Sequence, residues 1–477
     1  MLENIMNYKN KFIKDFLVIL LSNGIILISN IFTGLIIPKL LGVNNYGYYK
    51  IFTLYLGYAP LFHIGFVDGV LLKHGGENYN ILNREKFRFN TRFFFIMQTS
   101  ISLIIVIMSL LVLGGIYKFI AIMVGVDISI TNISSYYQYI SQCTMRFREL
   151  SLRRFLQSFL KILLVVVCYV LYKKKILLEL SSYYYIIALV LIDLLLLVWY
   201  VFTYREITFG NAEHYNSAKE RIIEYFKSGI IVTIAFQLSN LVFSLDRQFV
   251  SLLFDTNVYG TYSFAYSLVS MATVIISAIS LVLFPTLKRK SEESIVRDFA
   301  DSIALISGLV FLALIGYYPL SSFIRWYLPN YEDSLLYLRI VFPGLAISSC
   351  ITTIIFTYYK VLNRHLKYFR ICLFILVVSA LLNGLAYYIF KTPAAISWAS
   401  IITLGIWFLM GQAYFIRKYK VKWISNFIYM ILMSFAFYFS SKELSFFSLL
   451  KYFVAYVIST LLIHFKTIRR IARMIEK

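Results

Sequence analysis

The chain has 477 residues, of which 60% are hydrophobic and 14% are charged. Soluble domains average about 45–50% apolar and about 25% charged residues, so this composition excludes a soluble enzyme, a disordered protein and a nucleic-acid-binding domain. The net charge of +23 is instead typical of a membrane protein with basic cytoplasmic loops. We therefore expect an all-α integral membrane protein.

A membrane-spanning helix needs about 20 mostly apolar residues, and fourteen segments of the chain are suitable. The first follows three lysines and lacks a small-residue cleavage site, so we expect it to remain as a span. The fourth is the most polar, with Ser134, Ser135 and Gln138 in its second half, and this suits a cavity wall; the alternative is that this half lies outside the membrane. The expected spans are residues 16–37, 49–70, 92–113, 120–143, 156–172, 183–203, 228–250, 260–284, 300–319, 336–357, 368–389, 394–415, 423–440 and 447–464.

The distribution of basic residues predicts the orientation. With both termini inside, 34 of the 46 Lys and Arg residues fall in inner segments and nine in outer ones. Basic residues concentrate on the cytoplasmic side of membrane proteins, so both termini are expected in the cytoplasm. The triplet Lys173–Lys175 is the clear exception, and it indicates either a misplaced fifth span or an outer basic patch.

Two short outer turns resemble each other. Residues 40–49 read LLGVNNYGYY and residues 253–262 read LFDTNVYGTY, with five of ten positions identical. Each turn follows the first span of a group of six, so the chain predicts two parallel six-helix lobes around a central cavity. The expected parts are an N-lobe at 1–205, a C-lobe at 206–416, and two further helices with a cytoplasmic tail at 417–477.

These residues carry a family resemblance, which covers roughly residues 1–415. The Leu-Gly-x-x-x-Tyr-Gly stretch at 41–47, the Asp246-Arg247 pair before Tyr259-Gly260-x-Tyr262, and Phe284-Pro285 resemble the polysaccharide exporters of the multidrug/oligosaccharidyl-lipid/polysaccharide (MOP) superfamily. Within it the chain looks like a Wzx-type O-antigen or capsule repeat-unit flippase. The resemblance implies transport of undecaprenyl-pyrophosphate-linked oligosaccharides from the inner to the outer leaflet of the bacterial cell membrane.

Polar residues inside the spans are the candidate cargo-binding groups, since they are costly in lipid and usually functional. In the seventh span, Gln237, Asn240, Ser244 and Arg247 share one helical face. In the first span, Asn23 and Asn30 lie seven residues apart on one face. Both faces are expected to line the lumen, and bonding between neighbouring helices is the alternative.

Charged residues in the spans suggest two further roles. Lys50 and Arg339 join Arg247 in the outer third of the membrane, where they form a cationic zone for an anionic cargo or extend to the outer headgroups. Asp246 and Asp193 are candidates for an ion-coupling site (H⁺ or Na⁺). The alternative for each acid is a hydrogen bond between helices.

Several kinds of chemistry have no motif here. The chain contains no G-x-x-x-x-G-K-[ST] sequence for ATP, no G-x-S-x-G, no H-E-x-x-H and no C-x-x-C. We therefore expect no catalytic activity, no cofactor and no metal. Transport energy then has to come from an ion gradient, the membrane potential or removal of the product by a glycan polymerase.

Three other functions compete with the flippase. A cation-coupled multidrug exporter of the same superfamily would favour a more acidic or aromatic cavity. A membrane-embedded glycan polymerase or glycosyltransferase would need a large outer catalytic loop, and no expected outer loop exceeds about 15 residues. A peptidoglycan-precursor flippase shares the lipid carrier and is close to the first interpretation.

The assigned orientation is testable with reporter fusions. Fusions after residues 80 and 420 should report a cytoplasmic location, and a fusion near residue 325 an external one, because the basic loops stay inside. An external signal at residue 80 or 420 would contradict the assignment.

Overall fold

The protein is described by a computed structural model that covers residues 2–175, 180–288, 291–362 and 364–475. Within these ranges the chain is almost entirely helical and contains no strand, which confirms the expected all-α class. By compactness the chain divides into two units, Met1–Asn240 and Leu241–Lys477. The lobe boundary expected at 205/206 stays a prediction.

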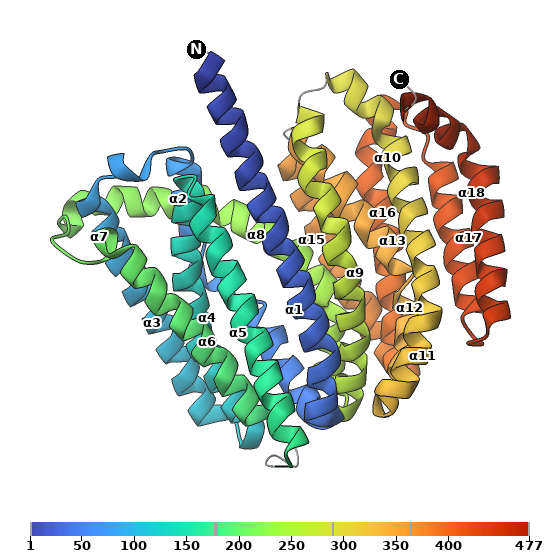
Figure 1. Cartoon of the computed structure of the whole chain (residues 1–477), viewed down its shortest axis with the longest axis horizontal. Helices are drawn as coiled ribbons and strands as arrows, with labels where there is room; N and C mark the ends of the chain where they lie inside the picture. The colour runs from blue at the N-terminus through green and yellow to red at the C-terminus, as the bar shows by residue number, and fades with distance from the viewer. Residues whose placement is uncertain (1, 176–179, 289–290, 363, 476–477) are drawn as a thin grey trace. The chain divides into compact units, whose positions relative to one another are not determined.

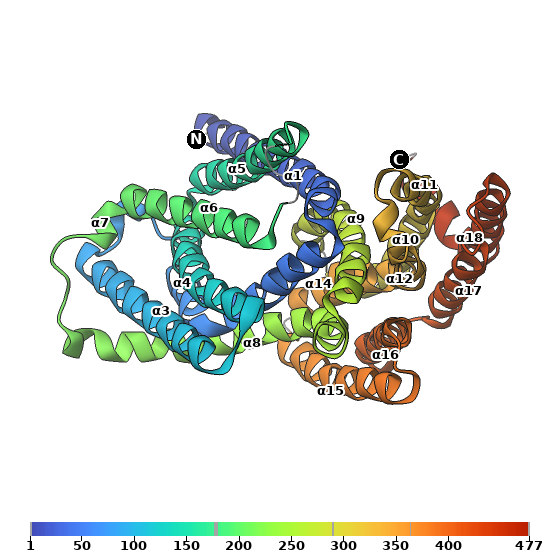
Figure 2. The same ribbon diagram turned by 90° about the horizontal axis from the view of Figure 1, so that it is seen from below.

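The first unit is a bundle of long helices (Figure 1). In it α1 packs along α5, and α4 lies between α3 and α6 (Figure 2). Its elements are α1 (Leu2–Leu56), η1 (Ala59–His63), α2 (Phe66–His74), η2 (Tyr79–Ile81), α3 (Arg84–Val112), α4 (Gly115–Cys143), α5 (Phe147–Lys173), α6 (Ser182–Thr203), α7 (Arg205–Thr208) and the first part of α8 (Tyr215–Leu253).

The second unit contains the remainder of α8 and three packed helix pairs. In these, α9 contacts α12, α15 contacts α16, and α17 contacts α18. Its elements are α9 (Thr256–Lys288), α10 (Glu292–Ala313), η3 (Leu314–Gly316), α11 (Tyr317–Tyr327), η4 (Pro329–Tyr331), α12 (Ser334–Val341), α13 (Gly344–Ser349), the π-helix η5 (Cys350–Ile355), α14 (Phe356–Val361), α15 (His365–Phe390), α16 (Pro393–Tyr419), α17 (Ile424–Ser440) and α18 (Phe446–Ile475).

Eleven helices in the described residues are long and apolar enough to cross a membrane. The three other expected spans have separate explanations. Span 49–70 joins the first across a kink at Gly42, whose φ is 66°. The side chains of residues 274–284, the second part of span 260–284, lie outside the described residues, and span 423–440 is the shorter helix Ile424–Ser440.

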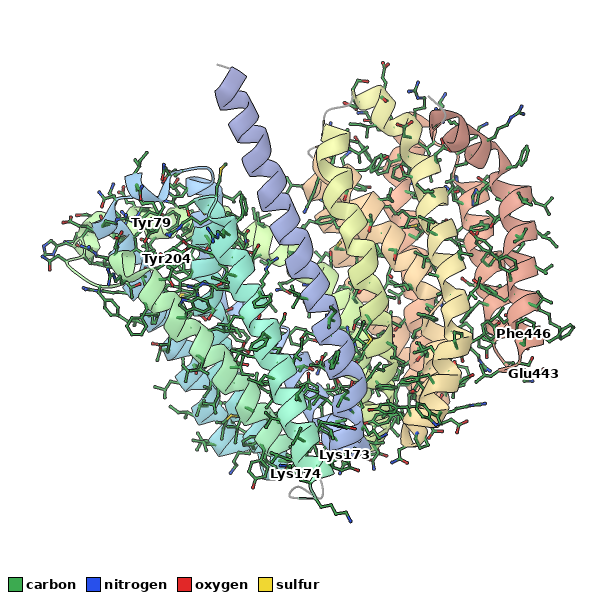
Figure 3. All side chains as sticks on the ribbon, viewed as in Figure 1. Tyr79, Lys173, Lys174, Tyr204, Glu443 and Phe446 are labelled. Atoms are coloured by element: carbon green, nitrogen blue, oxygen red, sulfur yellow. The ribbon has the colours of Figure 1, made fainter. Side chains whose placement is uncertain are left out.

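Labelled residues in Figure 3 mark the two ends of the first unit. Lys173 and Lys174 lie at one end of this unit, and Tyr79 and Tyr204 lie at the other. Since α5 ends at Lys173, the fifth span is not misplaced, and the basic triplet stands at the end opposite the loops that hold Tyr79.

The second expected span is broken. After η1 the chain passes through Ile64 (φ 51°) and Gly65 (φ 86°), both left-handed, before α2 begins. The carbonyls of Ala59 and Phe62 near the break accept hydrogen bonds from Asn132 (2.9 Å) and Gln98 (3.0 Å). Broken backbone is tolerated in a membrane only when the protein supplies such partners.

Glycines bring α2 and α8 into close contact beside this break. A Cβ added at Gly229 would collide with the carbonyl oxygen of Gly65 and approach the nitrogen of Gly69 to 2.5 Å. Small residues permit such backbone contact between membrane helices. The first half of α8 therefore packs directly on the backbone of α2.

A single methyl group should disrupt this contact. We expect Gly229→Ala to lower stability by at least about 1–3 kcal/mol, because the added atom meets backbone that cannot rotate away. Thermal unfolding of the detergent-solubilised chain measures the effect. Gly308→Ala is the matched control, since no atom lies within 4 Å of a Cβ built there; equal melting of the two variants would contradict the contact.

Candidate functional site

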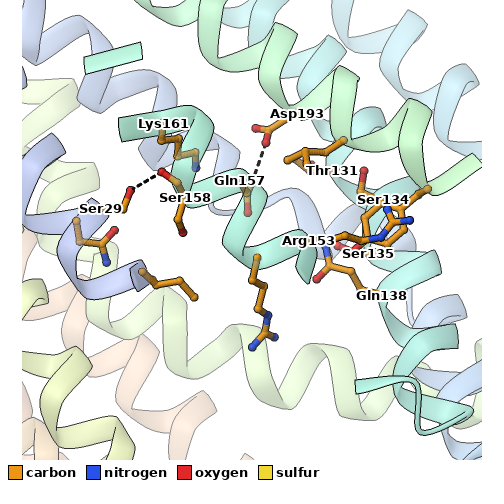
Figure 4. Close-up of a pocket in the computed structure, with 15 residues that line it drawn as sticks. Ser29, Thr131, Ser134, Ser135, Gln138, Arg153, Gln157, Ser158, Lys161 and Asp193 are labelled. Atoms are coloured by element: carbon orange, nitrogen blue, oxygen red, sulfur yellow. Dashed lines mark hydrogen bonds between the residues drawn. The ribbon is translucent and has the colours of Figure 1, made fainter. Parts of the chain in front are cut away.

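A polar cavity of about 340 Å³ lies inside the first unit, between α1, α4, α5 and α6 (Figure 4). Its α4 wall contains Thr131, Ser134, Ser135 and Gln138. The spacing of 3, 1 and 3 residues places these side chains on one helical face. The polar half of the fourth span thus forms a cavity wall, as its composition indicated.

The α5 wall supplies the positive charge. Arg153, Arg154 and Lys161 line the cavity together with Gln157 and Ser158. These five residues occupy two adjacent rows of one helical face. Three cations with one lining carboxylate, that of Asp193, give the cavity an excess of positive charge.

Arg153 is the most enclosed of these cations, with 3% of its surface exposed. Its guanidinium carbon lies 3.3 Å from the centre of the Tyr200 ring, and its Nη2 donates to the carbonyl of Trp199 at 3.3 Å. Its Nη1 has no hydrogen-bond partner in the part of the chain that the structure describes. The aromatic contact holds the side chain in place, and Nη1 is a buried donor without a partner in the described residues.

Asp193 meets a partner across the cavity. Gln157 Nε2 donates to its Oδ1 at 2.9 Å. Asp193 therefore forms a hydrogen bond between α5 and α6, which is the alternative expected beside ion coupling. Sequence reasoning missed a second acid, Asp127 on α4, which is fully buried and whose oxygens accept no hydrogen bond from any described residue. Asp127 lies one helical turn before Thr131. Its position inside an expected span is the feature by which the sequence could have identified it.

The first-span residues reach the same cavity in part. Asn30 lines it beside Ser29, whose hydroxyl donates to the carbonyl of Ser158 at 3.4 Å. The side chain of Asn23 lies outside the described residues. Asn30 and Asp193 are thus the two expected site residues that the structure brings to one cavity.

The expected polar face on α8 hydrogen-bonds along its own helix. Gln237 is buried, and its Oε1 accepts from Asn240 Nδ2 at 3.2 Å. The hydroxyl of Ser244 donates to the carbonyl of Leu241 at 3.3 Å. Gln237 and Asn240 belong to the first unit, and Ser244 and Arg247 belong to the second.

The three expected cations each lie on tyrosine rings. The Lys50 nitrogen is 5.3 Å from the centre of the Tyr46 ring. Arg247 lies 5.1 Å from the Tyr266 ring and donates from Nη2 to the carbonyl of Phe243 at 3.0 Å. Arg339 lies 4.7 Å from the Tyr438 ring. Each cation thus has an aromatic partner of its own, and a shared cationic zone stays a proposal.

Asp246 is surrounded by donors. Its Oδ2 accepts from the hydroxyl of Tyr262 at 2.9 Å and from that of Tyr266. Tyr262 in turn accepts from Ser397 at 3.4 Å. The carboxylate therefore links α8 to α9 in the second unit, which is the inter-helix role expected as the alternative to ion coupling.

The second unit contains an apolar groove of about 380 Å³ between α12, α13, α16 and α17. Ile347, Ile401, Phe427 and Met430 are among its lining residues, and no Asp, Glu, Lys or Arg lines it. The polar cavity of the first unit is therefore the better candidate for a charged cargo.

Comparisons with known proteins identify the fold. Residues 89–291 match the family described as polysaccharide biosynthesis protein. The structure is similar to the lipid II flippase MurJ in an inward closed conformation, with a TM-score of 0.65 and 13% identity over 96% of this chain and 100% of that one.

Two further structures share the fold. A MOP superfamily transporter from Pyrococcus furiosus gives a TM-score of 0.54 at 12% identity, covering 84% of this chain and 94% of that one. A point mutant of the Vibrio cholerae MATE transporter VcmN gives 0.54 at 12% identity over 86% and 97%. No curated protein matched the sequence. The chain is thus a multi-pass membrane protein whose fold is similar to that of MOP superfamily transporters.

Hydration of the cavity can be measured by cysteine labelling. Gln138→Cys should react with a water-soluble maleimide in membranes, because its polar surroundings admit water. Leu103→Cys, on the exposed apolar surface of α3, is the control and should stay unreactive in lipid. The native cysteines are all buried and give little background. A Gln138→Cys variant as inert as Leu103→Cys would show that the cavity is dry.

Proposed function

We propose that the chain is a flippase that moves undecaprenyl-pyrophosphate-linked oligosaccharide repeat units from the inner to the outer leaflet, by alternating access. The products would serve O-antigen, capsule or related surface polysaccharide synthesis. The observation that carries the proposal is the cation-rich polar cavity within a MOP transporter fold. The match of residues 89–291 to a polysaccharide biosynthesis family supports the same class of cargo.

The charge of the cavity suits a phosphate-bearing lipid. An anion cannot cross hydrocarbon without a large free-energy cost, so a carrier has to replace its water with fixed donors. Guanidinium groups bind phosphate oxygens through two parallel hydrogen bonds and keep their charge when partly desolvated. Arg153 and Arg154, with Lys161 one helical turn beyond Gln157, offer such donors from one helix face. The serine, threonine and amide groups opposite could bond to sugar hydroxyls.

The proposal extends to the residues first selected from the sequence. Arg247, Arg339 and Lys50 would attract the pyrophosphate or acidic sugars, while Gln237, Asn240, Ser244, Asn23 and Asn30 would bond to neutral groups of the cargo. The hydrogen bond of Asn240 to Gln237 supports a polar path along α8. These residues support the proposal less strongly than the polar cavity does, because each of the three cations already contacts a tyrosine ring.

The membrane potential is one energy source for the proposed transport. A potential that is negative inside repels an anion outward, so it assists export of a pyrophosphate by about 2.3 kcal/mol per charge per 100 mV. Export of the anionic cargo therefore does not have to overcome the potential. A coupling ion such as H⁺ or Na⁺ would serve the return step that resets the carrier.

The competing functions fit less well. A cation-coupled drug exporter would have to bind its cargo against the basic α5 wall, which repels cations. A peptidoglycan-precursor flippase remains the second candidate, because the lipid II flippase MurJ shares the fold over nearly the whole chain. We place the protein in the bacterial inner membrane with both termini in the cytoplasm, beside a glycan polymerase and other assembly proteins.

The α5 cations provide the test. In a bacterial strain that lacks its own repeat-unit flippase, Arg154→Gln and Lys161→Gln should each reduce surface glycan about tenfold or more, since a hydrogen bond to a charged group contributes about 1.5–3 kcal/mol. Immunoblots confirm equal amounts of the carrier. Arg247→Ala in the same assay tests the extension to the second unit.

The control is Arg148→Gln, which removes the same charge from an exposed position on the same helix. It should keep near-normal export. If Arg154→Gln and Lys161→Gln also export normally at equal expression, the cavity does not bind the cargo. If wild-type chain restores peptidoglycan synthesis but no surface glycan, the second candidate replaces the first.

A further inference from the structure

A histidine and an aspartate meet at the break in the second span. On a continuous helix, residues five positions apart such as His63 and Asp68 would lie on different faces. The helix is not continuous there, since Ile64 and Gly65 are both left-handed. As a result His63 Nε2 lies 4.0 Å from Asp68 Oδ2, and both residues are buried.

The hydrogen bonds around His63 fix its ring. The backbone N–H of Gly65 donates to Nδ1 at 3.3 Å. A nitrogen that accepts a hydrogen bond has no proton, so the neutral ring has its proton on Nε2, directed towards Asp68. A further proton would occupy Nδ1 and end the bond from Gly65.

Asp68 also contacts α8. The hydroxyl of Thr233 donates to Asp68 Oδ2, and this contact lies beside the glycine contact between α2 and α8. From α4, Tyr139 interacts electrostatically with Asp68.

The other elements at the break bring amides and hydroxyls. Gln98 of α3 and Asn132 of α4 bond to its carbonyls, and α8 supplies Thr233. Among the described residues, Asp68 is the titratable group beside His63, and Tyr139 is the titratable group that interacts with Asp68. No second cation competes for Asp68 in these contacts.

We propose that His63 and Asp68 form a proton-binding site that links the break in the second span to α8. The step adds one proton to His63 Nδ1, which turns the ring into a cation paired with the Asp68 carboxylate. The pair then has no net charge, whereas Asp68 beside a neutral ring leaves one buried negative charge, which is costly in a membrane.

Proton binding changes two contacts. The bond from Gly65 N–H to His63 is lost, and Asp68 is drawn towards the imidazolium and away from Thr233. Discontinuous helices in transporters commonly hold the coupling ion. A role for this proton in transport rests on the proposed function, whereas the binding of the proton to His63 does not.

The test follows the imidazole signals of the full chain by NMR in lipid nanodiscs without cargo, using isotope-labelled histidine. The chain contains five histidines, and the signal absent from His63→Gln belongs to His63. In wild-type protein this signal should show protonation between about pH 5 and 8. In Asp68→Asn the ring should stay neutral over that range, while Asp68→Glu should restore its protonation.

His74→Gln is the matched control. His74 is the last residue of α2, the helix that contains Asp68. It pairs with Glu77 at 3.0 Å, but Glu77 is exposed to solvent. This variant should leave the His63 signal unchanged. A His63 ring that stays neutral in wild-type protein, or that gains its proton equally in Asp68→Asn, would overturn the site.

Export separates the two proposals. Wild-type surface glycan from His63→Gln at equal expression would overturn the link to transport. Failure of the wild-type chain to export any glycan would instead reject the proposed function, and the NMR result on proton binding would stand.

Discussion

Polar groups within the hydrocarbon of a membrane find no water, so each has to be satisfied by another part of the protein. This constraint explains the many buried tyrosines. The hydroxyl of Tyr429 bonds to that of Thr460 at 2.8 Å, and that of Tyr452 bonds to the carbonyl of Phe311 at 2.7 Å. A tyrosine fills core volume like phenylalanine and adds a hydrogen bond between helices. The same rule decides where the backbone can leave the helix, which is where Gln98 and Asn132 reach the carbonyls of Ala59 and Phe62.

The polar cavity depends on the same supply of partners. The Tyr200 ring holds Arg153 in place, and Asp193 accepts a hydrogen bond from Gln157. The proposed cargo would therefore find Arg153 already held in position, so little ordering of this side chain is needed on binding. Preorganised charge of this kind also discriminates, because a cationic molecule of the same size would meet repulsion from Arg154 and Lys161.

The sequence predicted the class, the spans and the polarity of α4, because hydropathy and helical spacing depend on local composition. It did not predict the break at Ile64–Gly65, since an isoleucine gives no sign of a left-handed conformation, and the pairing of His63 with Asp68 was therefore missed. The α5 wall was not predicted, because Arg153 and Arg154 lie outside the expected span 156–172, whereas α5 runs without interruption from Phe147 to Lys173. Contacts such as Asp246 with Tyr262 depend on which helices pack together, and one sequence does not specify that.

The two similar turns use different backbone devices at equivalent positions. Gly42 adopts a positive φ, and α1 continues through it as a kinked helix. Its counterpart Asp255 separates two helices, and its carboxylate accepts from the backbone N–H of Val258 at 2.9 Å, as an N-cap does. Position 42, with φ 66° and ψ 172°, lies in a backbone region that is essentially restricted to glycine, whereas position 255 accepts serine, threonine or asparagine. If the two halves descend from one ancestral unit, their turns have since diverged in backbone conformation, and neither turn sequence can replace the other.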